Sequence, residues 1–103
     1  MELIQYIREI PDFPQKGINF KDITTLIKDP AAFKMVVDQI TDHFRNKGIT
    51  KVVSLESRGF IVGGALAYLL GAGFVPIRKS GKLPAETVSI SYELEYGSDM
   101  IQI

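Results

Sequence analysis

One stretch of the sequence, residues 51–70, constrains the fold more than any other. It opens with the apolar run VVSL at 52–55, continues through the polar turn ESRG at 56–59, and ends in a small-residue apolar run at 60–70. This order predicts a buried strand, a tight connection and a buried helix. The connection then lies at the N-terminus of the helix, where free backbone N–H groups and the helix dipole suit an anion such as phosphate.

A second apolar run, Phe74 to Ile77, follows this helix after a short connection. Strand, helix and strand with short connections form a βαβ unit, in which the two strands are parallel and the crossover is right-handed. Alternation in residues 87–96 and the run MIQI at 100–103 predict two more strands, with 97–99 as the turn between them. The sequence therefore predicts an α/β fold with a parallel sheet.

The amino-terminal part predicts two helices separated by a loop. Residues 2–9 have apolar positions at helical spacing, and a longer amphipathic helix at 30–47 begins with Asp29 as N-cap and ends at Gly48. Residues 11–25 hold two prolines and follow no regular period. We expect them to form an irregular loop with its own aromatic anchors.

Length and charge limit the possible classes of protein. A chain of 103 residues builds one domain, so we expect a single domain over 1–103, with 1–28 as its N-terminal helix and loop. The formal net charge of zero argues against a global field that recruits nucleic acid or membrane, and the absence of cysteine excludes disulfides and thiolate metal sites. No apolar run reaches the roughly 20 residues that span a bilayer, so we expect a cytoplasmic protein.

Two polar clusters follow the two predicted parallel strands. The first is ESRG at 56–59, and the second, RKSGK at 78–82, places three cations around Gly81. Because both follow neighbouring strands, they share the carboxyl-end rim where open α/β sheets bind ligands. Such a rim suits a polyphosphate. The alternatives are a solvated turn with Glu56 paired to Arg58, and a solvated basic loop.

Two further clusters carry side chains that could act on a substrate. Phe20, between Asn19 and Lys21, could stack on a flat heterocycle, whereas Phe13 is better explained as an aromatic anchor of the loop in the core. In the strand at 87–96, a carboxylate near a substrate could move a proton, although an exposed polar strand face is the alternative. The sequence has a single histidine, His43, and we find no plausible Ser-His-Asp set with it. No pair of possible metal ligands has a suitable spacing.

Four segments together resemble adenine phosphoribosyltransferases. They are DFPQKGINFKDITTLIKDP at 12–30, ESRGF at 56–60, IRKSGKLP at 77–84 and YELEYGSD at 92–99. The resemblance implies a type I phosphoribosyltransferase core of parallel strands with a flexible hood. It also implies transfer of a 5-phosphoribosyl group from PRPP to adenine, giving AMP and pyrophosphate in purine salvage, with Mg²⁺ bound to PRPP and a cytoplasmic homodimer.

The resemblance also implies residue roles. Adenine would be bound by Asn19, Phe20 and Lys21. Pyrophosphate or PRPP would be bound by Glu56, Ser57, Arg58, Arg78, Lys79 and Lys82. Glu95 would be the catalytic carboxylate near adenine N7, Arg58 would act beside it, and Tyr96 would lie in the closing loop. The chain departs from many family members in having Lys21 in place of Arg and Glu56 in place of Asp.

The family's PRPP signature, a hydrophobic strand followed by two acidic residues and a Thr/Gly-rich loop, does not occur in these 103 residues. The sequence stops in a strand-like pattern, so we expect it to be the front part of a longer protein and to be inactive alone. Two alternatives stay open: a non-catalytic PRPP-binding regulator of the same fold, and an enzyme that uses xanthine or hypoxanthine.

Overall fold

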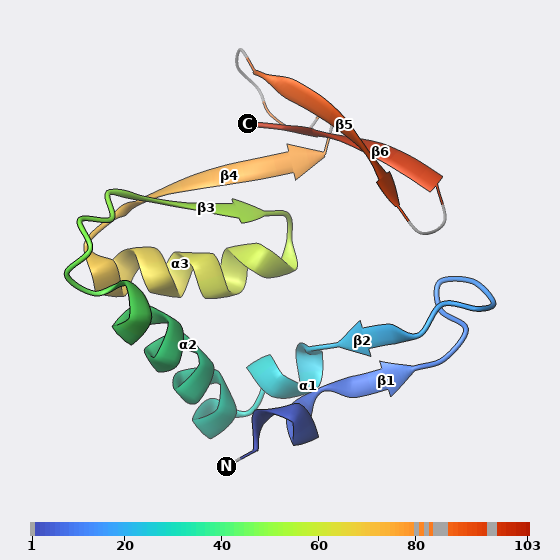
Figure 1. Ribbon diagram of the computed structural model, residues 1–103, viewed down its shortest axis with the longest axis horizontal. Helices are drawn as coiled ribbons and strands as arrows, with labels where there is room; N and C mark the ends of the chain where they lie inside the picture. Colours follow the sequence, from blue (N-terminus) through green and yellow to red (C-terminus); the bar gives the residue numbers. More distant parts are fainter. Residues whose placement is uncertain (1, 80, 82, 84–86, 95–96) are drawn as a thin grey trace. The chain divides into compact units, whose positions relative to one another are not determined.

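The structure, a computed structural model, describes residues 2–79, 81, 83, 87–94 and 97–103 (Figure 1). The chain divides into two compact units, Met1–Gln39 and Ile40–Ile103, and each is described by itself. The expectation of one domain over the whole chain stays a prediction. In the described ranges, no helix combines the length and the apolar character that crossing a membrane requires.

The second unit is built on a four-stranded sheet with strand order β3-β4-β6-β5. Its strands are β3 (Lys51–Leu55), β4 (Gly73–Lys79), β5 (Ser89–Leu94) and β6 (Gly97–Gln102). β3 and β4 are parallel, which confirms the predicted βαβ unit, while β4 with β6 and β5 with β6 are antiparallel. The sheet is therefore mixed, and only its β3–β4 pair has the parallel arrangement that the sequence predicted.

One predicted turn and the first two residues of another prove to lie inside strands. Residues 97–99 belong to β6, because Leu94 pairs with Gly97 and the antiparallel ladder continues from there. Arg78 and Lys79 were expected in a basic turn, but they are the last two residues of β4, where they pair with Gln102 and Ile101. Pairing with β6 extends β4 through both residues. Both cations are thereby fixed to the sheet.

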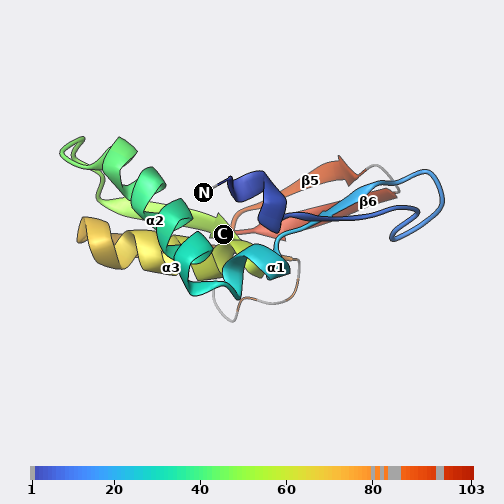
Figure 2. The same ribbon diagram turned by 90° about the horizontal axis from the view of Figure 1, so that it is seen from below.

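The crossover helix α3 (Arg58–Leu70) packs closely on β3 and β4, beside which it runs in Figures 1 and 2. A Cβ added at Gly63 would overlap Oγ of Ser54 and come within 2.9 Å of the Phe74 ring. Gly63 therefore sets how near the helix approaches the sheet. Its neighbour Gly64 has no such role, because a Cβ there would meet open space.

The first unit begins with a 3-10 turn and an antiparallel hairpin. The turn is Leu3–Tyr6, and the hairpin strands are β1 (Arg8–Ile10) and β2 (Phe20–Asp22), side by side in Figure 2. The short helix α1 (Thr24–Ile27) follows. The predicted helix at 2–9 is therefore wrong beyond Tyr6, and the predicted irregular loop at 11–25 contains a strand and the start of a helix.

The long helix α2 (Pro30–Phe44) begins as the sequence predicted. One carboxylate oxygen of Asp29 accepts the backbone N–H of Ala32 at 2.9 Å, which caps the helix, and Pro30 is its first residue. The helix ends three residues earlier than predicted. Asn46 adopts a left-handed conformation with a φ of 62° and breaks the helical repeat before Gly48.

The hairpin is held by a carboxylate that is nearly inaccessible to solvent. Asp22 is 5% exposed, and its side chain accepts hydrogen bonds from Nε (3.1 Å) and Nη2 (2.5 Å) of Arg8. It also accepts the backbone N–H and the hydroxyl of Thr24, at 2.9 Å and 2.8 Å. The Thr24 backbone first, and then Arg8, lower the pKa of Asp22 from 3.8 to about 2. Asp22 thus ties β1, β2 and α1 together.

The folded-state pKa of Asp22 lies below its ordinary value, so its charged form stabilises the fold. That contribution is complete above the ordinary pKa of 3.8 and is lost as the pH falls through about 2. We expect Asp22→Asn to lower the free energy of unfolding at pH 7 and to differ much less from the wild type at pH 2. Urea unfolding at both pH values measures this. Asp38→Asn, on the α2 surface, is the matched control, and a pH-independent Asp22→Asn effect would contradict the prediction.

Candidate functional site

The candidate site lies at the carboxyl ends of β3 and β4. The parallel register aligns Leu55 with Ile77, and the backbone N–H of Glu56 donates to the carbonyl of Ile77 at 2.8 Å. The ladder therefore extends one residue past β3. Because the register continues, Glu56 lies beside Arg78, the next residue of β4. Two polar clusters that are 22 positions apart in sequence are brought together here.

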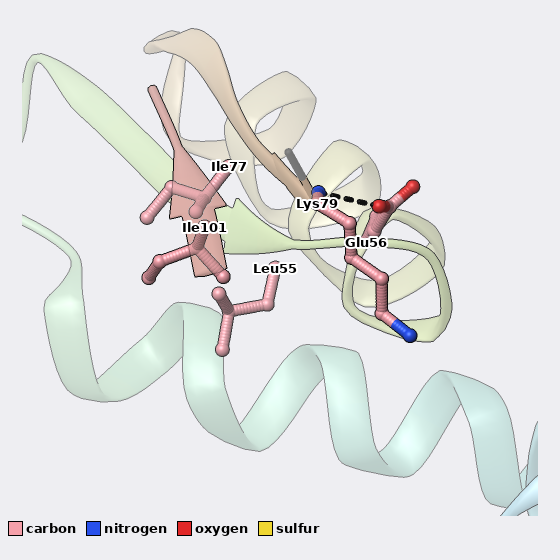
Figure 3. A pocket seen from close by; sticks show the side chains of 5 residues that line it. All are labelled: Leu55, Glu56, Ile77, Lys79 and Ile101. Carbon is pink, nitrogen blue, oxygen red and sulfur yellow. Dashed lines mark hydrogen bonds between the residues drawn. The ribbon is translucent and has the colours of Figure 1, made fainter. Parts of the chain in front are cut away.

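The Glu56 carboxylate links these two strand ends. One oxygen, Oε1, accepts the backbone N–H of Lys79 at 2.5 Å, as the dashed line in Figure 3 shows. The other, Oε2, accepts Nε and Nη2 of Arg78 at 3.3 Å each. The sequence had offered Arg58 as a partner for Glu56, but the structure pairs Glu56 with Arg78. Only 13% of the Glu56 side chain is exposed, against 36% for Arg78.

The hydrogen bond to Lys79 completes the parallel ladder where β3 turns away. Along β4, the backbone groups of successive residues face alternately the strand on one side and the strand on the other. The carbonyl of Ile77 faces β3 and accepts the N–H of Glu56, so the next group of β4 that faces this side is the N–H of Lys79. At this step the side chain of Glu56 accepts the bond, while the main chain turns into the connection to α3. The carboxylate therefore extends the ordered edge of the sheet by one bond.

The turn after Glu56 leads directly into α3. The Glu56–Ser57 peptide is cis, and α3 begins at Arg58, one residue after Ser57. The side chains of Ser57 and Arg58 are exposed, and the N–H of Phe60 donates to the carbonyl of Ser57 at 3.1 Å. The predicted polar turn at a helix N-terminus is thus present, and Arg58 is the first helical residue. Its binding of an anion stays a prediction.

A small hollow adjoins this edge on the sheet (Figure 3). It has a volume of about 170 Å³ and is lined by Leu55, Glu56, Ile77, Lys79 and Ile101. Most of the lining is apolar. In Figure 3 the Glu56 carboxylate faces the backbone N–H of Lys79, and the Lys79 ammonium group points away from that carboxylate. Among the described lining residues, Glu56 and Lys79 at the strand ends are the ones that offer polar side chains to a charged ligand.

The predicted adenine-binding residues lie in the first unit, at the start of β2. Asn19 is exposed and Phe20 is partly buried, with its ring edge-on to the ring of Phe13 and the centroids 5.2 Å apart. Phe13 itself is 48% exposed, so the prediction that it anchors the loop in a core is wrong, because its contact is with the hairpin. The ammonium group of Lys21 binds the carboxylate of Glu9, and this hydrogen bond lowers the pKa of Glu9.

Three predicted residues, Lys82, Glu95 and Tyr96, lie outside the described residues, so their roles stay predictions. Among the residues that the structure does describe, no group of three or more His, Asp or Glu side chains is placed to hold a metal ion. The structure thus gathers Glu56, Arg78 and Lys79 at one edge, with Ser57 and Arg58 in the adjoining turn.

The fold and this edge define the class of protein. It is an α/β protein with cationic residues at the carboxyl ends of a parallel strand pair and at the N-terminus of the helix that connects the two strands. No protein-family model matches the chain. It is 59% and 57% identical, over 105 residues, to the adenine phosphoribosyltransferases of Chlorobium chlorochromatii and Prosthecochloris aestuarii. Each match covers 100% of this chain and 59% of the relative.

Solved structures of the same enzyme are similar to the chain as well. That from Rhodothermus marinus has a TM-score of 0.87 and 53% identity, covering 97% of this chain and 57% of the other. That from Giardia lamblia, in complex with 9-deazaadenine, has a TM-score of 0.92 and 46% identity, covering 97% and 56%. The chain is therefore homologous, over its whole length, to adenine phosphoribosyltransferases. It spans about three fifths of the length of the curated relatives that it matches.

Sequence reasoning missed the link from Glu56 to Arg78 and Lys79. The signal was available, because Glu56 and Arg78 each follow residues that a parallel register would align. It also missed the ion pair between Arg8 and Asp22, which needed the hairpin register to become visible. In both cases the residue types were informative, and the partner was decided by strand pairing.

Proposed function

We propose that this protein serves the transfer of a 5-phosphoribosyl group from PRPP to adenine, which yields AMP and pyrophosphate. The observation that carries the proposal is the cationic edge at the carboxyl ends of β3 and β4, with Arg78 and Lys79 tied to Glu56. Homology to adenine phosphoribosyltransferases over the whole chain supports the choice of reaction. The edge and the turn at 56–59 would bind the pyrophosphate group.

The charge of this edge suits the step in which pyrophosphate leaves. As the bond between the ribosyl carbon and pyrophosphate breaks, negative charge grows on the departing oxygen and positive charge on the ribosyl group. Fixed cations near the departing group stabilise that change without rearranging. Arg58 at the start of α3 and Arg78 at the end of β4 would provide them, with Lys79, Lys82 and Ser57 as further pyrophosphate contacts.

Adenine would be bound by the start of β2. Phe20 would stack on the base, and Asn19 and Lys21 would contact its edge through their backbones. The engagement of the Lys21 ammonium with Glu9 supports a backbone contact, because that side chain already has a carboxylate partner. A solved relative was crystallised with 9-deazaadenine, and another, from Saccharomyces cerevisiae, with adenine. Glu95 would move the proton near adenine N7, and Tyr96 would belong to the closing loop.

Mg²⁺ would arrive bound to PRPP. The side chains proposed for the pyrophosphate site are mostly Arg and Lys, which donate hydrogen bonds and have no lone pair to offer a cation when charged. The oxygen ligands that Mg²⁺ prefers would therefore come from the substrate phosphates and water. Mg²⁺ would reduce the charge of PRPP, and the cations of the protein would bind the remaining oxygens.

The function predicts a selective reaction. The protein expressed from its natural reading frame should form AMP from adenine, PRPP and Mg²⁺, with little turnover of xanthine or hypoxanthine, as chromatography of the products would measure. We expect the 103-residue polypeptide alone to form no AMP, because it lacks the PRPP signature segment. Turnover with xanthine in preference to adenine would contradict the substrate, and PRPP binding without any turnover by the expressed protein would favour a regulator.

We also propose that the protein is cytoplasmic and forms a homodimer. The outer face of α3 supports the homodimer. This helix is apolar almost all round, and such a helix is normally covered on every side. Yet Tyr68 is 85% exposed, Ile61 48% and Leu69 45%. A second copy of the chain would bury this face.

The dimer has a direct test. Ile61→Glu combined with Tyr68→Glu should convert the dimer to a monomer in analytical ultracentrifugation, because both charges would be buried at the interface. Gln39→Glu, which adds a charge on the exposed surface of α2, is the control and should leave the mass unchanged. A monomeric wild type, or a dimer that survives both substitutions, would exclude this interface.

A further inference from the structure

We infer that Glu56 is a positioning residue of the pyrophosphate site: it holds Arg78 and the Lys79 backbone in place and does not itself bind the anion. The inference rests on the proposed function, because it concerns the same site. It differs from the role that the family resemblance implied, in which Glu56 stood among the direct contacts. What carries it is that the carboxylate accepts three hydrogen bonds from Arg78 and Lys79.

Charge and exposure exclude a direct contact. A carboxylate and a pyrophosphate oxygen are both negative, and at contact distance they repel each other. The Glu56 side chain is 13% exposed, while Arg78, its partner, is 36% exposed. The guanidinium group of Arg78 is therefore more accessible to an anion from solvent than the Glu56 carboxylate is.

The two carboxylate oxygens of Glu56 bind different partners and have different roles. Oε2 accepts both Nε and Nη2 of Arg78, and a planar guanidinium bonded at two nitrogens has a defined orientation. Oε1 accepts the N–H of Lys79 and so fixes the point at which the chain leaves β4. One side chain thus sets the direction of a cation and the start of the basic segment that follows.

The substitution Glu56→Gln separates these effects with little change in shape. An amide oxygen still accepts the N–H of Lys79, but the neutral amide holds the guanidinium of Arg78 less strongly than a carboxylate does. We expect Glu56→Gln to weaken binding of inorganic pyrophosphate about tenfold, which is the usual size for a lost charged hydrogen bond. The KM for PRPP should rise while the KM for adenine stays unchanged.

The test uses the protein expressed from its natural reading frame, with calorimetric titration of pyrophosphate and MgCl₂ followed by steady-state kinetics. Asp38→Asn, which also removes one carboxylate, is the control and should match the wild type in both. Glu56→Gln should add little to the effect of Arg78→Gln when the two are combined, because Glu56 acts through Arg78. Circular dichroism reports whether each variant is folded.

If Glu56→Gln does not fold, Arg78→Lys provides the second variant. It keeps the positive charge but cannot make two bonds to one oxygen, so pyrophosphate should bind several-fold more weakly, and unchanged affinity would overturn the inference. Glu56→Gln that binds pyrophosphate as tightly as the wild type, or more tightly, would overturn it too. A wild type that neither binds pyrophosphate nor forms AMP would instead refute the proposed function.

Discussion

The hydrogen bonds of Glu56 join the ends of two parallel strands, and the proposed pyrophosphate site depends on them. β3 ends at Leu55, but the N–H of Lys79 still needs an acceptor, which the Glu56 carboxylate provides at 2.5 Å. The same carboxylate accepts two hydrogen bonds from Arg78 and orients its guanidinium group. One residue therefore meets two requirements. The sheet needs acceptors for the donors at its strand ends, and the site needs cations that are held in place.

Packing beneath this edge fixes the turn that carries Arg58. Gly63 lets α3 approach Ser54 and Phe74 more closely than any residue with a side chain would allow. The N-terminus of α3 therefore lies next to the end of β3, and the turn at 56–59 connects them. In the first unit Asp22 has a comparable role, because Arg8 and Thr24 share its carboxylate and hold the hairpin to α1.

Much of the second unit could be predicted from sequence because its signals are local. Apolar runs of strand and helix length gave the βαβ unit, and Asp29 with Pro30 gave the start of α2. The hairpin of the first unit was missed, since strands of three residues carry too few positions to establish a period. The prediction for Phe13 was wrong, and the partner of Glu56 was missed, for another reason. Both depend on which segments pair, and the composition of the chain does not determine the pairing. The roles of Lys82, Glu95 and Tyr96 stay predictions.

Amide chemical shifts of the ¹⁵N-labelled protein, titrated with pyrophosphate and Mg²⁺, test the central claim most directly. If the cationic edge is the pyrophosphate site, the shifts of Ser57, Arg58, Arg78 and Lys79 should move together and saturate at one Kd, with the Arg78 side-chain Nε–H signal among them. Control amides in β1, such as Glu9, should stay still. Saturable binding that moves other residues and leaves the edge unchanged would contradict the account.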